Sequence, residues 1–340
     1  MLLDAVLVIL GLSLLLAGGD ALVRGAVALA ARLGVAPVLV GLTVVAFGTS
    51  APELVVNLLA AWRGSPDLGF GNVVGSNIAN IGLILGAAAL VTPAVVHPTL
   101  VRRDIPLLVG VSAVALILGT VSPFGEGFGR GDGIVLLGFF LLFLGLALRQ
   151  ALNERALNRR PGPAAPAPGA RAPEKDIEGG RDGGMGGDEE GGPGAGRILV
   201  LHVLGLGGLV LGGELTVRGA TELATTFGIA EAVIGLTLVA VGTSLPELAT
   251  SVLAARRGQA DVAVGNVVGS NLFNLLFVWG TTVTLAPSRL PPRGEVDLIA
   301  LLGFAVILLL LVRWRPRIPR WGGALLLLGY LAYVAWLPMR

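Results

Sequence analysis

Two glutamates at the centre of long apolar segments are the residues of this chain best suited to chemistry. Glu53 closes the motif GTSAPE at 48–53, and Glu247 closes GTSLPE at 242–247. A charged side chain in the middle of a membrane span costs roughly 2.5–3.5 kcal/mol on insertion scales, and no basic residue lies in the middle of a span to pair with either glutamate. A chain that carries this cost twice, at equivalent points, is predicted to use both carboxylates.

Each glutamate follows a proline and two hydroxyl residues. Pro52 lacks an N–H and its ring clashes with the carbonyl of Gly48, so the helix is predicted to kink or break and to release carbonyl oxygens near Ala46 to Gly48. Pro246 repeats this arrangement. Hydroxyl, carboxylate and carbonyl oxygens are hard ligands, which suit Na⁺ and Ca²⁺. The predicted side-chain ligands are Thr49, Ser50 and Glu53 in the first motif, and Thr243, Ser244 and Glu247 in the second.

A second motif, GNVVGSN, occurs unchanged at 71–77 and 265–271. Each copy, together with an asparagine three residues beyond its end, places Asn, Ser and Asn at positions i, i+4 and i+8, on one face of a helix. Amides and hydroxyls in an apolar span either join helices or bind an ion, and the glycines let a neighbouring helix approach. We expect Asn80 and Asn274 to contact the ion and Asn72 and Asn266 to pack helices, and both interpretations remain open for the others. These others are Ser76, Asn77, Ser270 and Asn271, and the glycines are Gly71, Gly75, Gly265 and Gly269.

Both motifs belong to an internal repeat. Residues 41–80 align without a gap on residues 235–274, an offset of 194, with 25 of 40 positions identical. The offset also relates Gly18-Gly19-Asp20 to Gly212-Gly213-Glu214, so each repeat begins one span earlier and holds five spans. Because five is odd, the second copy enters the membrane from the opposite side, which predicts an inverted-topology repeat with half-sites that meet at the membrane centre.

Composition predicts an all-α membrane protein with ten transmembrane helices in a 5+5 inverted repeat. Hydrophobic residues make up 54% of the chain and charged residues 14%, and mean hydropathy is +0.84. The chain has no cysteine, and its basic residues mark topology rather than a nucleic-acid surface. The expected spans are 4–31, 37–62, 70–91, 104–122, 132–150, 197–225, 231–255, 264–286, 296–313 and 320–338.

A segment rich in proline, glycine and charge divides the two halves. The halves are predicted at 1–152 and 197–340, with a disordered linker at 153–196, which has too few apolar residues to bury a core. Alternate loops carry seventeen and five Lys or Arg residues, with the linker on the basic side. The positive-inside rule then predicts a multi-pass protein of the cell (inner) membrane with a cytoplasmic linker and both termini outside.

Other functions fit the sequence less well. A proline kink or a small-residue spacing, taken alone, is more often structural. His97 and His202 have no second ligand at helical spacing, which argues against a zinc site, and neither lies mid-span as an intramembrane protease would need. A passive channel does not explain paired inverted half-sites. The expectation is therefore a transporter, with no enzymatic activity and no cofactor.

These motifs closely resemble the alpha-repeats of the cation/calcium exchanger superfamily, in particular the prokaryotic sodium/calcium exchangers and their potassium-dependent relatives. The resemblance rests on GTSAPE, GTSLPE and the paired GNVVGSN segments, and it covers the whole chain in span count and duplication. It implies that Glu53 and Glu247 are the shared Ca²⁺/Na⁺ carboxylates. Some members carry Asp where this chain has Asn80 or Asn274. The resemblance further implies flanking ligands at Thr49, Ser50, Ser76, Thr243, Ser244 and Ser270, backbone ligands at Ala46 and Ala240, and completion of the centre by Asn80 and Asn274.

The function implied is secondary active antiport by alternating access, with Na⁺ exchanged for Ca²⁺ and Ca²⁺ normally extruded. The alternative is an antiporter of the same superfamily that couples Ca²⁺, or another cation, to H⁺. The expected partners are Ca²⁺ and Na⁺ as substrates and the lipid bilayer, with no nucleic acid, and the chain is expected to function as a monomer.

Overall fold

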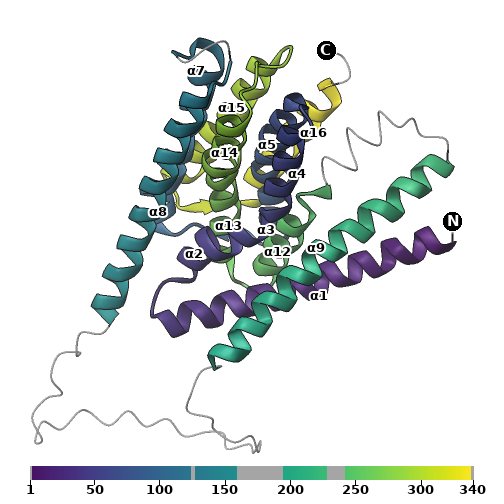
Figure 1. The fold of residues 1–340 in the computed structure, drawn as a ribbon. Coiled ribbons are helices and arrows are strands. Elements are labelled where there is room, and N and C mark those ends of the chain that lie inside the picture. Colours follow the sequence, from purple (N-terminus) through teal and green to yellow (C-terminus); the bar gives the residue numbers. More distant parts are fainter. Residues whose placement is uncertain (1, 124–126, 159–193, 228–241, 338–340) are drawn as a thin grey trace, which may run out of the picture.

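A computed structural model describes residues 2–123, 127–158, 194–227 and 242–337, and the fold is almost entirely helical (Figure 1). The elements of the first half are α1 (Leu2–Leu33), α2 (Pro37–Val40), η1 (Gly41–Val45), α3 (Ala46–Thr49), α4 (Ala51–Trp62), α5 (Pro66–Ala79), η2 (Asn80–Leu85), α6 (Gly86–Val91), β1 (Ala94–Val95), η3 (Leu100–Asp104), α7 (Ile105–Val121) and α8 (Arg130–Asn158). Those of the second half are α9 (Ala195–Thr226), α12 (Leu245–Arg256), α13 (Ala260–Phe273), η5 (Asn274–Val278), α14 (Trp279–Leu285), α15 (Gly294–Arg313), β2 (Arg317–Ile318) and α16 (Arg320–Trp336). The η elements are π-helical turns that continue the neighbouring α-helices.

Seven of the described helices are long and apolar enough to cross a membrane, and a bent pair makes an eighth candidate. The bent pair is Pro37–Thr49 with Ala51–Trp62. Two other expected spans are shorter than the roughly 20 residues that a crossing needs: α12 has 12 residues and α16 has 17. The expected span at 231–255 lies partly outside the described residues. The structure therefore confirms a multi-span helical protein.

The helices that carry GNVVGSN form the centre of the molecule. In the most apolar stretch of Ala260–Leu285, 94% of residues are buried, and in that of Pro66–Val91, 78%. The corresponding share is only 33% in α1 and in α9, whose exposed leucines suit contact with lipid. The polar motif residues are thus shielded from lipid by the surrounding helices.

Helices α1 and α9 lie against each other in opposite directions, across one side of the remaining helices (Figure 1). Glycines allow this close approach. A Cβ at Gly18 would lie 2.8 Å from the backbone oxygen of Gly205, and a Cβ at Gly205 would lie 3.0 Å from that of Gly18. Small residues at such a crossing bring two backbones into van der Waals contact. The pair joins the two halves of the chain, since α1 begins the first half and α9 the second.

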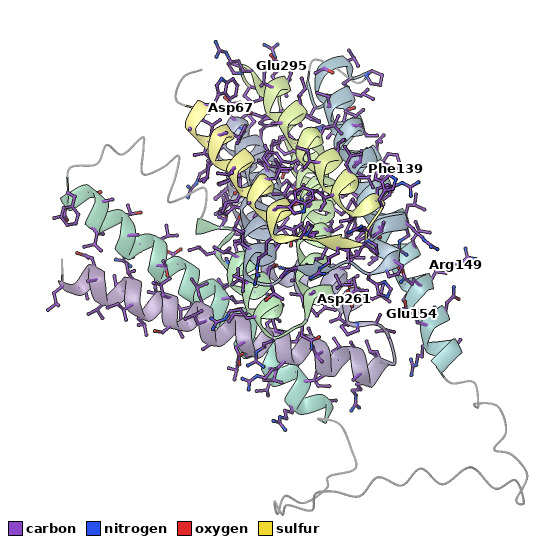
Figure 2. The ribbon with its side chains drawn as sticks, turned by 180° about the vertical axis from the view of Figure 1, so that it is seen from behind. Asp67, Phe139, Arg149, Glu154, Asp261 and Glu295 are labelled. Atoms are coloured by element: carbon purple, nitrogen blue, oxygen red, sulfur yellow. The ribbon has the colours of Figure 1, made fainter. Side chains whose placement is uncertain are left out.

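Helix α8 continues to Asn158, past the predicted start of the linker at 153, so that boundary was wrong. Glu154 Oε1 accepts a hydrogen bond from Gln150 Nε2 at 2.9 Å, one helical turn away. Its Oε2 accepts one from the backbone N–H of Ala36 at 2.8 Å, at the start of α2. Figure 2 labels Glu154 on this part of α8. The remainder of the expected linker, 159–193, lies outside the described residues.

Candidate functional site

The first glutamate lies just beyond a break in its helix. Ser50 has φ −85° and ψ 7°, outside the helical region, and the helices on either side of it are bent by 43°. Pro52 is the second residue of α4, where its missing N–H costs no helical hydrogen bond. The predicted break is confirmed. The carbonyl of Ala46 accepts the Ser50 N–H at 3.0 Å and the Thr49 hydroxyl at 3.4 Å, so these two bonds hold the break.

The second repeat adopts the same local geometry. Ser244 precedes α12 with φ −91° and ψ 4°, and Pro246 is again the second residue of the helix that follows. Two motifs separated by 194 residues thus reach matching backbone conformations, as expected when the sequence itself dictates the break. Ala240 lies outside the described residues, so its expected role stays a prediction.

Glu53 and Glu247 are both completely buried, with 0% of their surface exposed. Ser50 joins the two repeats here, since its Oγ donates a hydrogen bond to Glu247 Oε1 at 3.0 Å. The carboxylate of one repeat therefore contacts the helix break of the other. A buried pair of like charges calls for a positive partner.

Threonine and asparagine link the repeats in a reciprocal pattern. Thr49 Oγ1 donates to Asn266 Oδ1 at 3.2 Å, and Thr243 Oγ1 donates to Asn72 Oδ1 at 3.4 Å. The repeat offset relates the two bonds, because Thr243 lies 194 residues after Thr49 and Asn72 lies 194 residues before Asn266. The interpretation of Asn72 and Asn266 as packing residues is confirmed and sharpened, because each one holds the helix break of the opposite repeat.

Asn80 and Asn274 each begin a π-helical turn, η2 and η5 respectively. Such turns interrupt the regular α-helical ladder and occur frequently at functional sites. Asn80 Nδ2 donates to Asn271 Oδ1 at 3.0 Å, and Asn274 Nδ2 donates to Ser76 Oγ at 3.3 Å. Each amide nitrogen therefore bonds to the opposite repeat, and the amide oxygens of Asn80 and Asn274 remain available to bind an ion.

All but one of the atoms that lack a hydrogen-bond partner at this centre are oxygens. Among the described residues, buried polar atoms are normally paired, so a cluster of unpaired ones indicates a missing partner. Oxygens that lack donors suit a hard cation. The unpaired oxygens are Glu53 Oε1 and Oε2, Glu247 Oε2, Asn57 Oδ1, Asn77 Oδ1, Asn80 Oδ1, Asn274 Oδ1, Ser244 Oγ, Thr250 Oγ1 and Ser270 Oγ, and the one nitrogen is Asn271 Nδ2.

The glycines of GNVVGSN behave as expected where their neighbours are described. A Cβ at Gly265 would lie 2.8 Å from the carbonyl oxygen of Val38, and one at Gly269 would clash with that of Leu42. The described residues place nothing within 4 Å of a Cβ at Gly71 or Gly75. The repeat-related partners of those two would be residues 232 and 236, which lie outside the described part of the chain.

Three buried polar residues near the site were missed. Asn57 lies one turn after Glu53 and donates to its backbone oxygen at 2.9 Å. Ser251 accepts a hydrogen bond from Asn266 Nδ2 at 3.0 Å, and Thr250 is also fully buried. Spacing could have identified two of them. Asn57 and Ser251 each lie four residues after a glutamate, and the repeat offset of 194 relates them to each other.

The histidines lie apart from this centre. His202 Nδ1 contacts the carbonyl oxygen of Ile198 at 2.8 Å, and His97 Nδ1 accepts the Thr99 N–H at 3.3 Å. Within the described ranges, no cluster of three or more His, Cys, Asp or Glu residues could hold a metal. The site therefore has two carboxylates supplemented by neutral oxygens, rather than a conventional metal centre.

Fold and site together define an integral membrane protein of the ion-transporter class. The family model for sodium/calcium exchanger proteins matches residues 3–149 and 197–339, which is nearly all of the sequence outside the expected linker. The chain belongs to the sodium/calcium exchanger family.

Individual relatives match the chain over nearly their whole lengths. The chain is 37% identical to inner membrane protein YrbG of Escherichia coli (strain K12), covering 99% of this chain and 97% of that protein. It is 33% identical to sodium/calcium exchanger MaX1 of Methanosarcina acetivorans, covering 96% of each. Among solved structures, the sodium-calcium exchanger NCX_Mj soaked with zero Na⁺ and Ca²⁺ matches with a TM-score of 0.79 and 32% identity, covering 99% of both chains.

Proposed function

We propose that the chain is a secondary active antiporter that exchanges Na⁺ for Ca²⁺ by alternating access and normally extrudes Ca²⁺. Glu53 and Glu247 are the carboxylates that the two ions share. The flanking oxygens come from the side chains of Thr49, Ser50, Ser76, Asn80, Thr243, Ser244, Ser270 and Asn274, and from the carbonyls of Ala46 and Ala240.

The observation that carries the proposal is the buried cluster of unpaired oxygens around two opposed carboxylates. One Ca²⁺, or two Na⁺, would neutralise the two charges, so the two ions can alternate at one place. An empty site would hold two repelling charges in a low dielectric, which disfavours movement of the unloaded protein between its two states. Such a penalty supports coupled exchange over uniport. The names of the relatives MaX1 and NCX_Mj point to the same pair of ions.

The proposed architecture has ten membrane-spanning segments, five in each half, related by inverted topology. The reciprocal contacts between threonine and asparagine support it, because they are the contacts that a two-fold axis in the membrane plane would generate. The linker is placed in the cytoplasm and both termini outside, and one chain suffices for transport.

Substitution of the glutamates tests the proposal. In liposomes loaded with Na⁺, uptake of Ca²⁺ should fall to background in Glu53→Gln and in Glu247→Gln, because each variant loses one of the two charges that balance Ca²⁺. Glu222→Gln, an exposed glutamate of α9, is the matched control and should transport normally. Near-normal exchange by either site variant, with insertion verified, would reject the assignment. Uptake driven by a pH gradient without Na⁺ would instead favour an H⁺/Ca²⁺ antiporter.

A further inference from the structure

A groove lies between the C-terminal end of α15 and the start of α16, far along the chain from the carboxylates. Its volume is about 930 Å³, close to the upper end of the range of roughly 300–1,000 Å³ for small-molecule sites. It is open to the outside of the protein, and most of its lining comes from α15, the β2 segment and α16. The groove is therefore accessible to molecules of the bilayer.

Three arginines line the groove: Arg315, Arg317 and Arg320. All three are exposed, and none of the salt bridges among the described residues involves them. Only Arg320 has a hydrogen bond from its side chain to the protein, from Nε to the Leu90 carbonyl oxygen at 3.2 Å, within the described part of the chain. The groove thus concentrates positive charge that no carboxylate among the described residues pairs with.

The remainder of the lining is apolar or aromatic. Ile307, Leu310 and Leu325 form a wall along the two helices, and all three are exposed. Trp314 and Trp321 flank the arginines with 79% and 65% of their surfaces exposed. Exposed tryptophans and arginines at the end of an apolar helix mark the interface between headgroups and hydrocarbon. Charge and apolar surface are therefore stacked along the membrane normal, as in a phospholipid.

The backbone that carries the arginines is held in place. Strand β2 pairs antiparallel with β1, with Arg317 opposite Val95, and the Val96 N–H donates to the Pro316 oxygen at 2.8 Å. Ile318, between Arg317 and the start of α16, is fully buried. Such anchoring lowers the entropy lost when a ligand binds.

We propose that this groove binds an anionic phospholipid. The guanidiniums of Arg315, Arg317 and Arg320 hold the phosphate by charge-assisted hydrogen bonds, and an acyl chain lies along Ile307, Leu310 and Leu325. Scattered interfacial arginines are ordinary in membrane proteins, but here three converge with two tryptophans on one preformed cavity. This binding goes beyond the proposed ion exchange and does not depend on it.

The test measures lipid binding directly, on the purified full-length chain in detergent, by native mass spectrometry and by lipid titration. The probe is phosphatidylglycerol, with phosphatidylcholine and inorganic phosphate as comparison ligands. The triple variant Arg315→Gln/Arg317→Gln/Arg320→Gln should bind phosphatidylglycerol roughly a hundredfold more weakly, because each basic residue near anionic lipid contributes about 1 kcal/mol, a factor of about five. The corresponding triple Arg→Lys variant should retain most of the binding.

The matched control removes the same charge elsewhere. Arg32, Arg102 and Arg256 are exposed and are assigned by the charge count to the same membrane face, so their triple Gln variant should bind phosphatidylglycerol normally. Equal losses in the two triple variants would show only general attraction to charge and would overturn the proposal. Equal affinity for phosphatidylcholine or for inorganic phosphate would also overturn it. If the groove triple variant fails to fold, Arg317→Gln alone should weaken binding about fivefold, and unchanged binding would count against the site.

Discussion

Glu53 and Glu247 show how single residues at this site depend on the opposite half of the chain. Ser50, three residues before Glu53, donates its hydroxyl to Glu247 rather than to its own neighbour. Thr49 likewise bonds to Asn266. Each half therefore completes the polar environment of the other, and neither half contains a finished site.

The reciprocal hydrogen bonds predict matching coupling energies. In a double-mutant cycle, Thr49→Val and Asn266→Leu should be coupled by about 0.6 kcal/mol, the average for hydrogen bonds between membrane helices. Thr243→Val and Asn72→Leu should give a similar value, because the offset of 194 relates the two pairs. The free energy of unfolding in mixed detergent micelles provides the measurement. As a control, the crossed pair Thr49→Val and Asn72→Leu shares no hydrogen bond and should be additive; coupling there would contradict the pairing.

The break at Ser50 interrupts the helix that carries Glu53. It ends α3 one turn before Glu53 and orients the first turn of α4 toward the site. Because Pro52 has no N–H, the break cannot close into a continuous helix. Helix interruptions at membrane depth are tolerated only where they are buried or line a cavity, as this one does.

Replacing Pro52 should slow ion exchange without lowering the stability of the fold. Pro52→Ala restores an N–H and allows α3 and α4 to join, so the melting temperature should stay the same or rise. Exchange of Na⁺ for Ca²⁺ should slow about tenfold, equivalent to about 1.4 kcal/mol, because the hydroxyls move away from the carboxylates. Pro66→Ala, at the ordinary start of α5, should change neither quantity. Unchanged exchange in Pro52→Ala would show that the break is dispensable.

The pairing of α1 with α9 depends on backbone contact that admits no side chain. Gly18→Ala places a Cβ 2.8 Å from the Gly205 oxygen, so the helices must separate, at a cost of about 1–3 kcal/mol. The control is Gly207→Ala on α9, where the described residues leave at least 4 Å free around a Cβ. That variant should be neutral or slightly stabilising, because alanine favours helix over glycine. Melting temperatures of the purified proteins distinguish the outcomes, and equal effects of both substitutions would exclude close packing as the reason.

At the scale of the whole molecule, several contacts break the repeat symmetry, and one of them is a salt bridge. Asp20 of α1 forms salt bridges with Arg24, at 3.0 Å, and with Arg257 at the end of α12. The equivalent residues are Glu214 and Arg63, and no salt bridge among the described residues joins those two. In an inverted repeat that works by alternating access, the two halves exchange conformations between the two states. In the proposed cycle the structure represents one state, and a salt bridge between Glu214 and Arg63 is expected in the other.

Crosslinking can detect this exchange, because the chain has no cysteine of its own. The pair Asp20→Cys/Arg257→Cys should react with a short bifunctional thiol reagent in one state, and Glu214→Cys/Arg63→Cys in the other. Changing the side from which Na⁺ or Ca²⁺ is supplied should raise one yield and lower the other. Loss of a partly exposed salt bridge is worth about 0.2–1 kcal/mol, so Asp20→Asn should change transport rates less than about fivefold. Two yields that rise and fall together would contradict the symmetric exchange.

The sequence by itself determined the local features of this protein. Apolar length and composition determined the helical membrane class, and proline with two hydroxyl residues determined the break before Glu53. These features depend on residues within a turn or two of each other, so spacing and backbone chemistry suffice to predict them. The same local reasoning set the end of the first half too early, because Glu154 is held by the backbone of Ala36, which lies 118 positions away in the chain.

Only the tertiary structure decided which half-site atoms meet. The bonds from Ser50 to Glu247 and from Asn80 to Asn271 join residues 197 and 191 positions apart, and nothing local distinguishes these partners from other polar residues of the repeats. The repeat predicted that the two halves would be equivalent, but contact depends on how closely packed helices rotate and slide against each other. That geometry is set by shape complementarity over whole helix surfaces, such as the crossing of α1 and α9 at Gly18 and Gly205, which a one-dimensional pattern does not contain.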